Sequence, residues 1–279
     1  MAIALALVCA CAYGSSDFLA GVISRRAHYA WVGLFAQGTA AVLVLVAALL
    51  VGGDLSASAV GWGALSGVGG GVGSVALYRG FARGQMSVAG PISGAGSAAI
   101  PAAAGLLLGE RPSAVTLVGV ALALPAVWLI ASAGDFRSGQ LVEGSVDGLL
   151  AGGGFGLLFL ALSRADADSG LWPTVFGQLV ALLAIAVFLA VAVRGATAGL
   201  RSRATVLGAA AAGTLGGLAT VAFLLASRQG LLVVVSVLAA LYPGVTVLLA
   251  RVLLRERSTR RQLAGLVLAA VAVTVITVG

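Results

Sequence analysis

One carboxylate lies deep within an apolar stretch near the start of the chain. Asp17 follows Tyr13 and Ser16 at spacings that place the three side chains on one face of a helix. An aspartate at the middle of a membrane costs about 2.5–3.5 kcal/mol on insertion scales, so we expect a functional reason for it. On a face toward an internal cavity, it would bind a polar or cationic solute or take up a proton. The alternative is an interfacial ion pair with Arg79 or Arg83.

Further candidate groups are hydroxyls and amides within other apolar stretches. The hydroxyls lie near prolines: Ser93 and Ser97 near Pro91 and Pro101, and Ser236 and Tyr242 near Pro243. A proline leaves a helix carbonyl without its usual donor, and breaks of this kind near mid-membrane are where transporters bind substrate. Gln37 and Gln178 either line a pathway or form an interhelical hydrogen bond worth about 1 kcal/mol or less, which is the simpler expectation.

The stretches that hold these groups belong to a membrane protein. Of 279 residues, 61% are hydrophobic and 9% are charged, and the mean hydropathy is +1.13. A soluble domain carries about 25% charged residues. The net charge of +7 comes from arginines in short turns between apolar runs, which is typical of membrane topology. We therefore expect an integral membrane protein with no nucleic-acid partner.

Ten apolar stretches approach the length of about 20 residues that a membrane-spanning helix needs. They are Ala2–Ile23, Trp31–Val51, Val60–Tyr78, Val88–Leu108, Ala114–Ala133, Asp147–Ser163, Leu171–Val193, Ala204–Ser227, Leu231–Ala250 and Gln262–Val278. The first stretch ends at Arg25 and Arg26 rather than at a cleavage site, so it should be retained. The polar segment 134–146 is expected to link two five-helix domains, 1–133 and 147–279.

The two halves carry similar residues at nearly constant offsets. Glu110 recurs as Glu256, Gly84 as Gly230 and Gly119 as Gly265, at an offset of 146, and Trp31, Phe35 and Gln37 recur as Trp172, Phe176 and Gln178, at an offset of 141. Each half has an odd number of spans, so the second must enter the membrane from the opposite side. The predicted fold is therefore an all-α integral membrane protein whose ten transmembrane helices form two inverted five-helix repeats.

The arginines predict an orientation. Thirteen lie in turns on one side of the membrane, and Arg111, Arg164 and Arg228 lie on the other. Because positively charged turns favour the cytoplasm, both termini are expected to face outward.

Other chemistry has little support in the sequence. Cys9 and Cys11 point to different faces of a helix, and His28, the only histidine, lies in a turn. A metal site would need a cluster of ligands, and direct use of ATP would need a Lys-Ser/Thr pair after the run Gly69–Gly71. We expect no metal, no cofactor and no enzyme activity.

The run from Ala76 to Gly84, the Gly-Glu-Arg turn at 109–111 and the opening from Tyr13 to Phe18 resemble the EamA-like branch of the drug/metabolite transporter superfamily. The resemblance covers the whole chain. It implies alternating access, often the proton-coupled export of amino acids or other small metabolites, with a central cavity framed by the first, third and fourth helices of each half. Tyr78, at the end of the third stretch, joins the expected substrate contacts. Members usually keep their termini in the cytoplasm, opposite to the arginine count.

The expected function is secondary active transport of an amino-acid-like or amphipathic metabolite. A lipid or lipid-carrier flippase is the alternative, and a long lateral opening between helices would favour it. An intramembrane enzyme would need paired Asp/His or Ser/His groups at membrane depth, and Asp17 stands alone there. The expected partners are a small-molecule substrate, protons and the lipid bilayer. The chain is expected in the cell membrane, as a multi-pass bacterial inner-membrane protein that is a monomer or a homodimer.

Overall fold

The computed structural model describes residues 1–24, 26–82, 86–131, 141–192, 202–255 and 259–279, and the regular elements within these ranges are all helical. The first half contains α1 (Ala2–Ser24), α2 (Tyr29–Val51), α3 (Ala57–Ala82), α4 (Met86–Leu107) and α5 (Ala114–Ala131). The second half contains α6 (Leu141–Ser163), the short 3-10 helix η1 (Ala167–Ser169), α7 (Trp172–Ala192), α8 (Arg203–Ser227), α9 (Leu232–Ala239), α10 (Tyr242–Leu253) and α11 (Arg260–Val278).

The helices have the length and surface of membrane spans. Within the described ranges, nine helical stretches are long and apolar enough to cross a membrane, with α9 and α10 counted as one, and Ile92–Leu107 of α4 is a shorter apolar stretch. On α7, Leu183 is 63% exposed and Val191 is 67% exposed, so apolar side chains cover the outside of the bundle. The prediction of a multi-pass, all-helical membrane protein is confirmed at this level.

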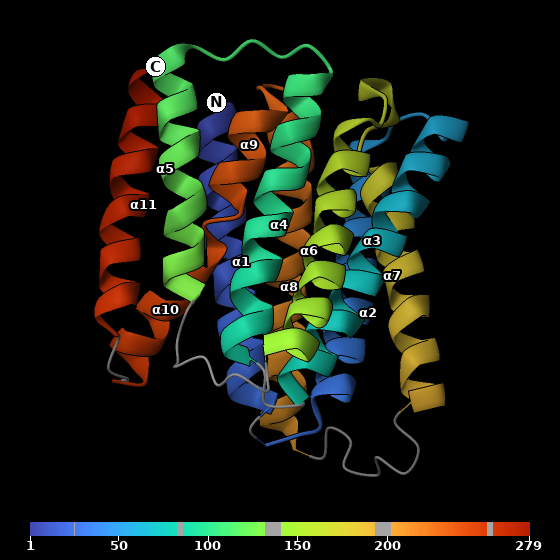
Figure 1. Ribbon diagram of the computed structural model, residues 1–279. Helices are drawn as coiled ribbons and strands as arrows, with labels where there is room; N and C mark the ends of the chain where they lie inside the picture. Colours follow the sequence, from blue (N-terminus) through green and yellow to red (C-terminus); the bar gives the residue numbers. More distant parts are fainter. Residues whose placement is uncertain (25, 83–85, 132–140, 193–201, 256–258) are drawn as a thin grey trace.

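Figure 1 shows the long helices side by side, with both chain ends at the same end of the bundle. Helix α1 packs against α8 and α10, and α3 packs against α6 and α7. Helix α4 packs against α6 and α9, α2 against α7 and α8, and α5 against α11. Every residue of α9 is buried, so this short helix lies in the core of the bundle.

Glycine allows the closest of these contacts. In the pair formed by α5 and α11, a Cβ added at Gly119 would lie 2.6 Å from Cγ1 of Ile276. A Cβ added at Gly265 would lie 2.9 Å from Cγ1 of Ile130. A larger residue at either position would therefore separate the helices, as expected for small residues at interfaces between membrane helices.

Three predicted boundaries are wrong. Helix α6 begins at Leu141, so residues 141–146 belong to a helix and not to the linker, and 134–140 lie outside the described residues. Helix α3 runs from Ala57 to Ala82, beyond both ends of the stretch expected there. Hydropathy detects only the part of a helix inside the hydrocarbon, whereas backbone hydrogen bonds continue the helix into the interface. The ninth stretch forms two helices, α9 and α10.

Candidate functional site

Helix α1 has an outer face and an inner face. Ala4, Val8 and Cys11 are exposed and recur at helical spacing on one face, as expected for side chains that contact lipid. Asp17 lies on roughly the opposite face. It is exposed although the residues beside it on that face, Tyr13 and Gly14, contact α8 and α10. Its carboxylate therefore lies in a recess of the bundle that solvent can reach.

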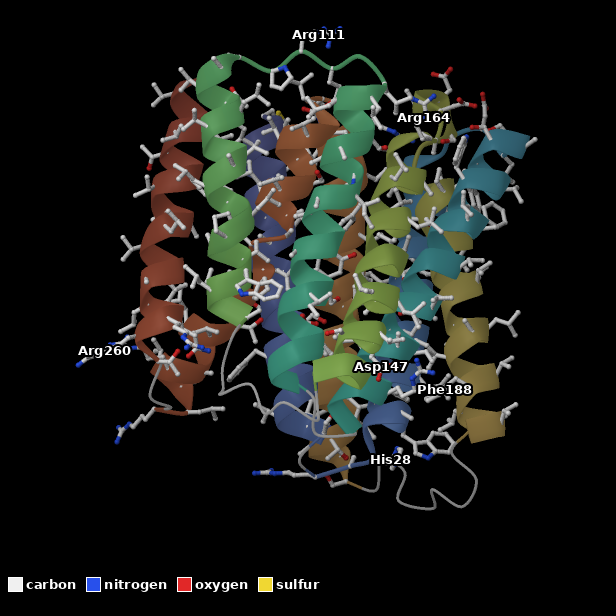
Figure 2. The ribbon with its side chains drawn as sticks, in the orientation of Figure 1. His28, Arg111, Asp147, Arg164, Phe188 and Arg260 are labelled. Carbon is white, nitrogen blue, oxygen red and sulfur yellow. The ribbon has the colours of Figure 1, made fainter. Side chains whose placement is uncertain are left out.

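The recess extends toward the end of α1. Gly21 is one helical turn beyond Asp17 and is also exposed. A Cβ added at Gly21 would have no described atom of another element within 4 Å. This end of the bundle holds His28 and Arg260, as Figure 2 shows, and is opposite to the end with Arg111.

The break in the ninth span lies near this carboxylate. Helix α9 ends at Ala239, and α10 begins at Tyr242 with a proline in its first turn. Pro243 has no N–H to donate to the carbonyl of Ala239. The N–H of Gly244 donates to Leu241 at 2.9 Å rather than to Ala240. Two carbonyls at the negative end of the α9 dipole thus lack their usual helical donors. The prolines of α4, in contrast, leave that helix continuous.

Aromatic side chains from four helices meet beside the break. The ring centroids of Tyr13 and Tyr242 are 6.2 Å apart, with 58° between the ring planes. Phe159 of α6 contacts Tyr13 edge-on at 6.3 Å and stacks on Phe223 of α8 at 4.3 Å. Asp17 lies one helical turn beyond Tyr13 on the same face of α1, and a Cβ added at Gly14 of this helix would overlap the carbonyl of Tyr242. The structure thus brings three of the predicted site residues, Tyr13, Asp17 and Tyr242, into one region.

A chain of hydrogen bonds leads away from Tyr13 across four helices. The hydroxyl of Thr220 donates to the carbonyl of Gly216 at 2.9 Å, so the Tyr13 hydroxyl, 2.9 Å from the Thr220 oxygen, acts as the donor to it. Nε2 of Gln178 also donates to Thr220, at 3.2 Å. Nε2 of Gln37 donates to Oε1 of Gln178 and, at 3.3 Å, to its backbone carbonyl. The chain therefore joins α1, α8, α7 and α2.

The sequence identified Tyr13, Gln37 and Gln178 of this chain as candidate residues and missed Thr220. The interhelical hydrogen bond expected for Gln37 and Gln178 is present, and the two amides bond to each other. Thr220 was missed because a single threonine in an apolar helix resembles any other. Thr214 of the same helix, for example, donates to the carbonyl of Ala210, within its own helix. Only the packing of α8 against α1 and α7 distinguishes the two threonines.

Arg79, a possible ion-pair partner of Asp17, binds a different carboxylate, that of Asp147. Nε and Nη2 of Arg79 donate to Oδ1 of Asp147 at 2.8 Å and 2.5 Å. The side chain of Asp147 is 1% exposed and that of Arg79 is 40% exposed, so the ion pair extends from the core to the surface. It connects α3 to α6. The other possible partner, Arg83, lies outside the described residues. Sequence reasoning missed Asp147 because it took this residue only as the edge of a span.

The other predicted site residues lie in helix contacts. Their hydroxyls donate to carbonyls as follows: Ser16 to Ala212 at 2.7 Å, Ser97 to Gly94 at 2.9 Å, and Ser236 to Val233 at 3.4 Å. Ser93 is 1% exposed, and its hydroxyl has no hydrogen-bond partner among the described residues. The side chain of Tyr78 lies outside the described part of the structure. These serines thus belong to the packing around the site.

Glu110 caps a helix from the other half of the chain. Its Oε1 accepts from the N–H of Leu232 at 2.6 Å, and its Oε2 accepts from the N–H of Val233 at 2.9 Å. These are the first N–H groups of α9, where a helix favours negative charge. Glu110 therefore acts as the N-terminal cap of α9 and connects the two halves of the chain.

Arg228 makes a second connection at the same end of the bundle. Its guanidinium donates to the carbonyl of Gly170 and to that of Asp166, both at 2.8 Å. It thereby joins the end of α8 to the turn between α6 and α7. Figure 2 shows Arg111 and Arg164 at this end of the bundle. The end is therefore held together by the charged side chains of Glu110 and Arg228, which bind backbone groups.

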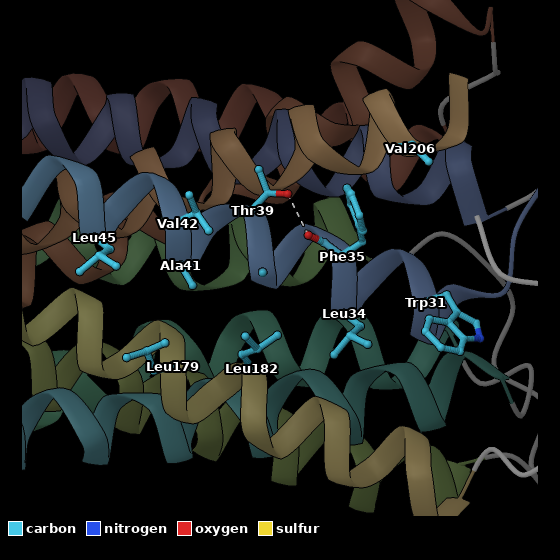
Figure 3. A pocket seen from close by; sticks show the side chains of 11 residues that line it. Trp31, Leu34, Phe35, Thr39, Ala41, Val42, Leu45, Leu179, Leu182 and Val206 are labelled. Atoms are coloured by element: carbon cyan, nitrogen blue, oxygen red, sulfur yellow. Dashed lines mark hydrogen bonds between the residues drawn. The ribbon is translucent and has the colours of Figure 1, made fainter. Parts of the chain in front are cut away.

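An apolar groove lies on the outside of the bundle, between α2 and α7 (Figure 3). Its volume is about 840 Å³, and residues that line it include Trp31, Leu34, Phe35, Leu179, Leu182 and Val206. The hydroxyl of Thr39, also in the lining, donates to the carbonyl of Phe35 at 2.9 Å. The groove thus offers mainly hydrocarbon surface, and nothing in the sequence pattern had marked it.

Comparison with known proteins shows the fold. No family model matches this sequence, and no curated protein matches it. One solved structure, described as "Crystal structure of protein", is similar over 99% of this chain and 96% of its own, with a TM-score of 0.79 and 16% sequence identity. At this identity, the similarity shows that the two chains share a fold over nearly their whole length.

Proposed function

We propose that this chain is a secondary transporter built from two inverted five-helix units. It moves a small amphipathic or amino-acid-like metabolite across the cell membrane, which we take to be a bacterial inner membrane, by alternating access. The observation that carries the proposal is the solvent-accessible carboxylate of Asp17 beside the broken ninth span. Discontinuous helices with exposed carbonyls at mid-membrane are a common way to build a solute site.

Reciprocal contacts support the inverted repeat. Gly119 and Gly265 differ by 146 positions, as do Ile130 and Ile276, and each glycine packs against the isoleucine of the other half. A two-fold relation produces this pattern, because residue i contacts the counterpart of j and j contacts the counterpart of i.

A second set of contacts repeats in the same way. A Cβ at Gly67 of α3 would overlap the carbonyl of Gly177 of α7, and a Cβ at Gly213 of α8 would overlap the carbonyl of Ala36 of α2. The offsets are 146 for the first residue of each pair and 141 for the second. Helices α3 and α8 thus contact α7 and α2 at equivalent positions, as two inverted units would.

Solute transport and its coupling to protons can be tested on protein reconstituted into proteoliposomes. Pools of amino acids and of amphipathic metabolites are first screened by thermal shift, and compounds that stabilise the protein are then tested for flux in proteoliposomes across a pH series. We expect a proton gradient to drive solute flux through the wild type, and we expect flux through Asp17→Asn to lose its dependence on pH. Stabilising compounds that show no flux at any pH would contradict transport. An unchanged pH dependence in Asp17→Asn would contradict proton coupling through this residue.

The lateral groove supports a lipid flippase as a second candidate. A groove of about 840 Å³ between α2 and α7 is large enough to admit part of an apolar chain directly from the bilayer. Flippase activity predicts that proteoliposomes containing the protein equalise a fluorescent phospholipid between leaflets, as measured by bleaching with a membrane-impermeant reductant. Leu182→Trp, which fills the groove, should abolish this exchange. Exchange no faster than in protein-free liposomes would contradict the flippase and leave metabolite transport in place.

A further inference from the structure

We propose that Asp17, Tyr13 and Tyr242 form the binding site for an organic ammonium group, so that the transported molecule is a cation with an apolar body. The inference rests on the transport function proposed above and specifies its substrate class. Three features of the described structure support it: an accessible carboxylate, two aromatic rings and the carbonyl end of a broken helix.

The carboxylate supplies the charge. Asp17 is exposed within the recess, between helices that contact α1 at Tyr13 and Gly14, so a cation that enters is attracted more strongly than in bulk water. Arg79, which could have neutralised it, is bound to the buried carboxylate of Asp147. A cationic solute would provide a compensating charge for Asp17.

The two tyrosines supply surfaces suited to an organic cation. Their centroids are 6.2 Å apart, and their planes are inclined by 58°, so the rings form a corner rather than a stack. A hydrogen bond of 2.9 Å to Thr220 fixes the ring of Tyr13. Ammonium groups bind to the faces of aromatic rings, and methylated ammonium does so without losing hydrogen bonds. Phe159, in contact with Tyr13, extends the apolar surface for the body of the solute.

The end of α9 adds a favourable field. The carbonyls of Ala239 and Ala240 lack their usual helical donors, and they lie immediately before Tyr242. The negative end of a helix dipole stabilises a nearby cation. A bare metal ion would need several oxygen ligands, and the described residues contain no group of three His, Cys, Asp or Glu side chains that could hold one. The combination therefore favours an organic cation over a metal ion.

A pair of isosteric probes separates charge from shape. The meta-hydroxyphenyl-trimethylammonium ion and meta-tert-butylphenol differ only in the nitrogen or carbon at the centre of the trimethyl group. Binding is measured by isothermal titration calorimetry on the purified full chain in detergent. We expect the cation to bind about tenfold more tightly than the neutral probe, as a charge-assisted contact in a partly desolvated site predicts. Equal affinities for the two probes, or no binding of the cation, would overturn the proposal.

Variants assign the preference to the three residues. Asp17→Asn should remove the preference, and Asp17→Glu, which keeps the charge, should retain most of it. Tyr242→Phe keeps the ring and should bind the cation nearly normally, whereas Tyr242→Leu should weaken binding about fivefold. Asp54→Asn removes the same charge from an exposed loop and serves as the matched control. Each variant is compared at equal thermal stability and elution volume. A full preference in Asp17→Asn would overturn the site.

The same proteins distinguish the site from the transport function. Asp17-dependent binding of the cation without flux in proteoliposomes would contradict transport and leave the ammonium site standing. Flux of a neutral or anionic metabolite that is unaffected by Asp17→Asn and Tyr242→Leu would contradict the ammonium site and leave transport standing.

Discussion

Gln37 of α2 donates a hydrogen bond to the side-chain oxygen of Gln178 of α7, which lies 141 positions later in the chain. In the proposed inverted repeat, the two-fold axis that relates α2 to α7 would pass between these two residues. The same amide also donates to the backbone of Gln178, and Gln178 donates onward to Thr220. The pair is thus the outer end of the hydrogen-bond chain that holds Tyr13 at the candidate site.

The Gln37–Gln178 contact predicts a measurable coupling energy. In a double-mutant cycle with Gln37→Leu and Gln178→Leu, we expect a coupling of about 0.6 kcal/mol in unfolding free energy, the average for hydrogen bonds between membrane helices. Steric-trapping or detergent unfolding measures it. Thr214→Val removes a hydroxyl whose hydrogen bond lies within its own helix, and it should show no coupling to Gln37→Leu. Strictly additive effects of the two glutamine substitutions would contradict the contact.

The close contact between α5 and α11 predicts a cost for added methyl groups. Gly119→Ala and Gly265→Ala should each lower the unfolding free energy by about 1–3 kcal/mol, because the new Cβ would overlap an isoleucine side chain. Gly61→Ala is the control, since a Cβ there would meet nothing within 4 Å, and it should be neutral or slightly stabilising. Equal melting temperatures for the three variants would show that the helices are not closely packed at these positions.

The capping of α9 by Glu110 predicts a local effect. Glu110→Gln replaces a charged acceptor of two N–H groups and should destabilise the protein by about 1–2 kcal/mol. Hydrogen exchange, followed by mass spectrometry, should become faster at Leu232 and Val233. The neighbouring Arg111→Gln removes an exposed charge from the same turn and should leave exchange in α9 unchanged. Unaltered protection of α9 in Glu110→Gln would contradict the cap.

The recess beside α1 predicts one-sided access for water. Gly21→Cys should react with a membrane-impermeant thiol reagent added on the side that holds Arg260, and not from the other side. Cys11 is an internal control, because it is exposed on the outer face of α1, where lipid should shield it. Arg260→Cys, at an exposed position, reports the orientation of the vesicles. Labelling of Gly21→Cys from both sides would show that the recess is not closed at the end with Arg111.

Properties that depend on local sequence were predictable. The apolar stretches and the shared face of Tyr13 and Asp17 follow from hydropathy and from helical periodicity. The missing N–H of proline did not identify the break by itself, because Pro91 and Pro101 leave α4 continuous whereas Pro243 lies at the start of α10. The inverted repeat was inferred from residues that recur at offsets of 146 and 141 and stays a proposal that reciprocal contacts support. The helix ends were misplaced because hydropathy responds to the hydrocarbon and not to the backbone.

The sequence by itself determined that this is a helical membrane protein with a carboxylate inside its first span, because both properties can be read from residue type and spacing. Only the tertiary structure decided which side chains contact each other between helices. Arg79 meets Asp147 across 68 positions, Gln178 meets Thr220 across 42, and Glu110 meets Leu232 across 122. These contacts depend on which helices are neighbours and how far each is rotated, and packing between small residues sets both. No local pattern in an apolar sequence shows which helices are neighbours or how far each is rotated.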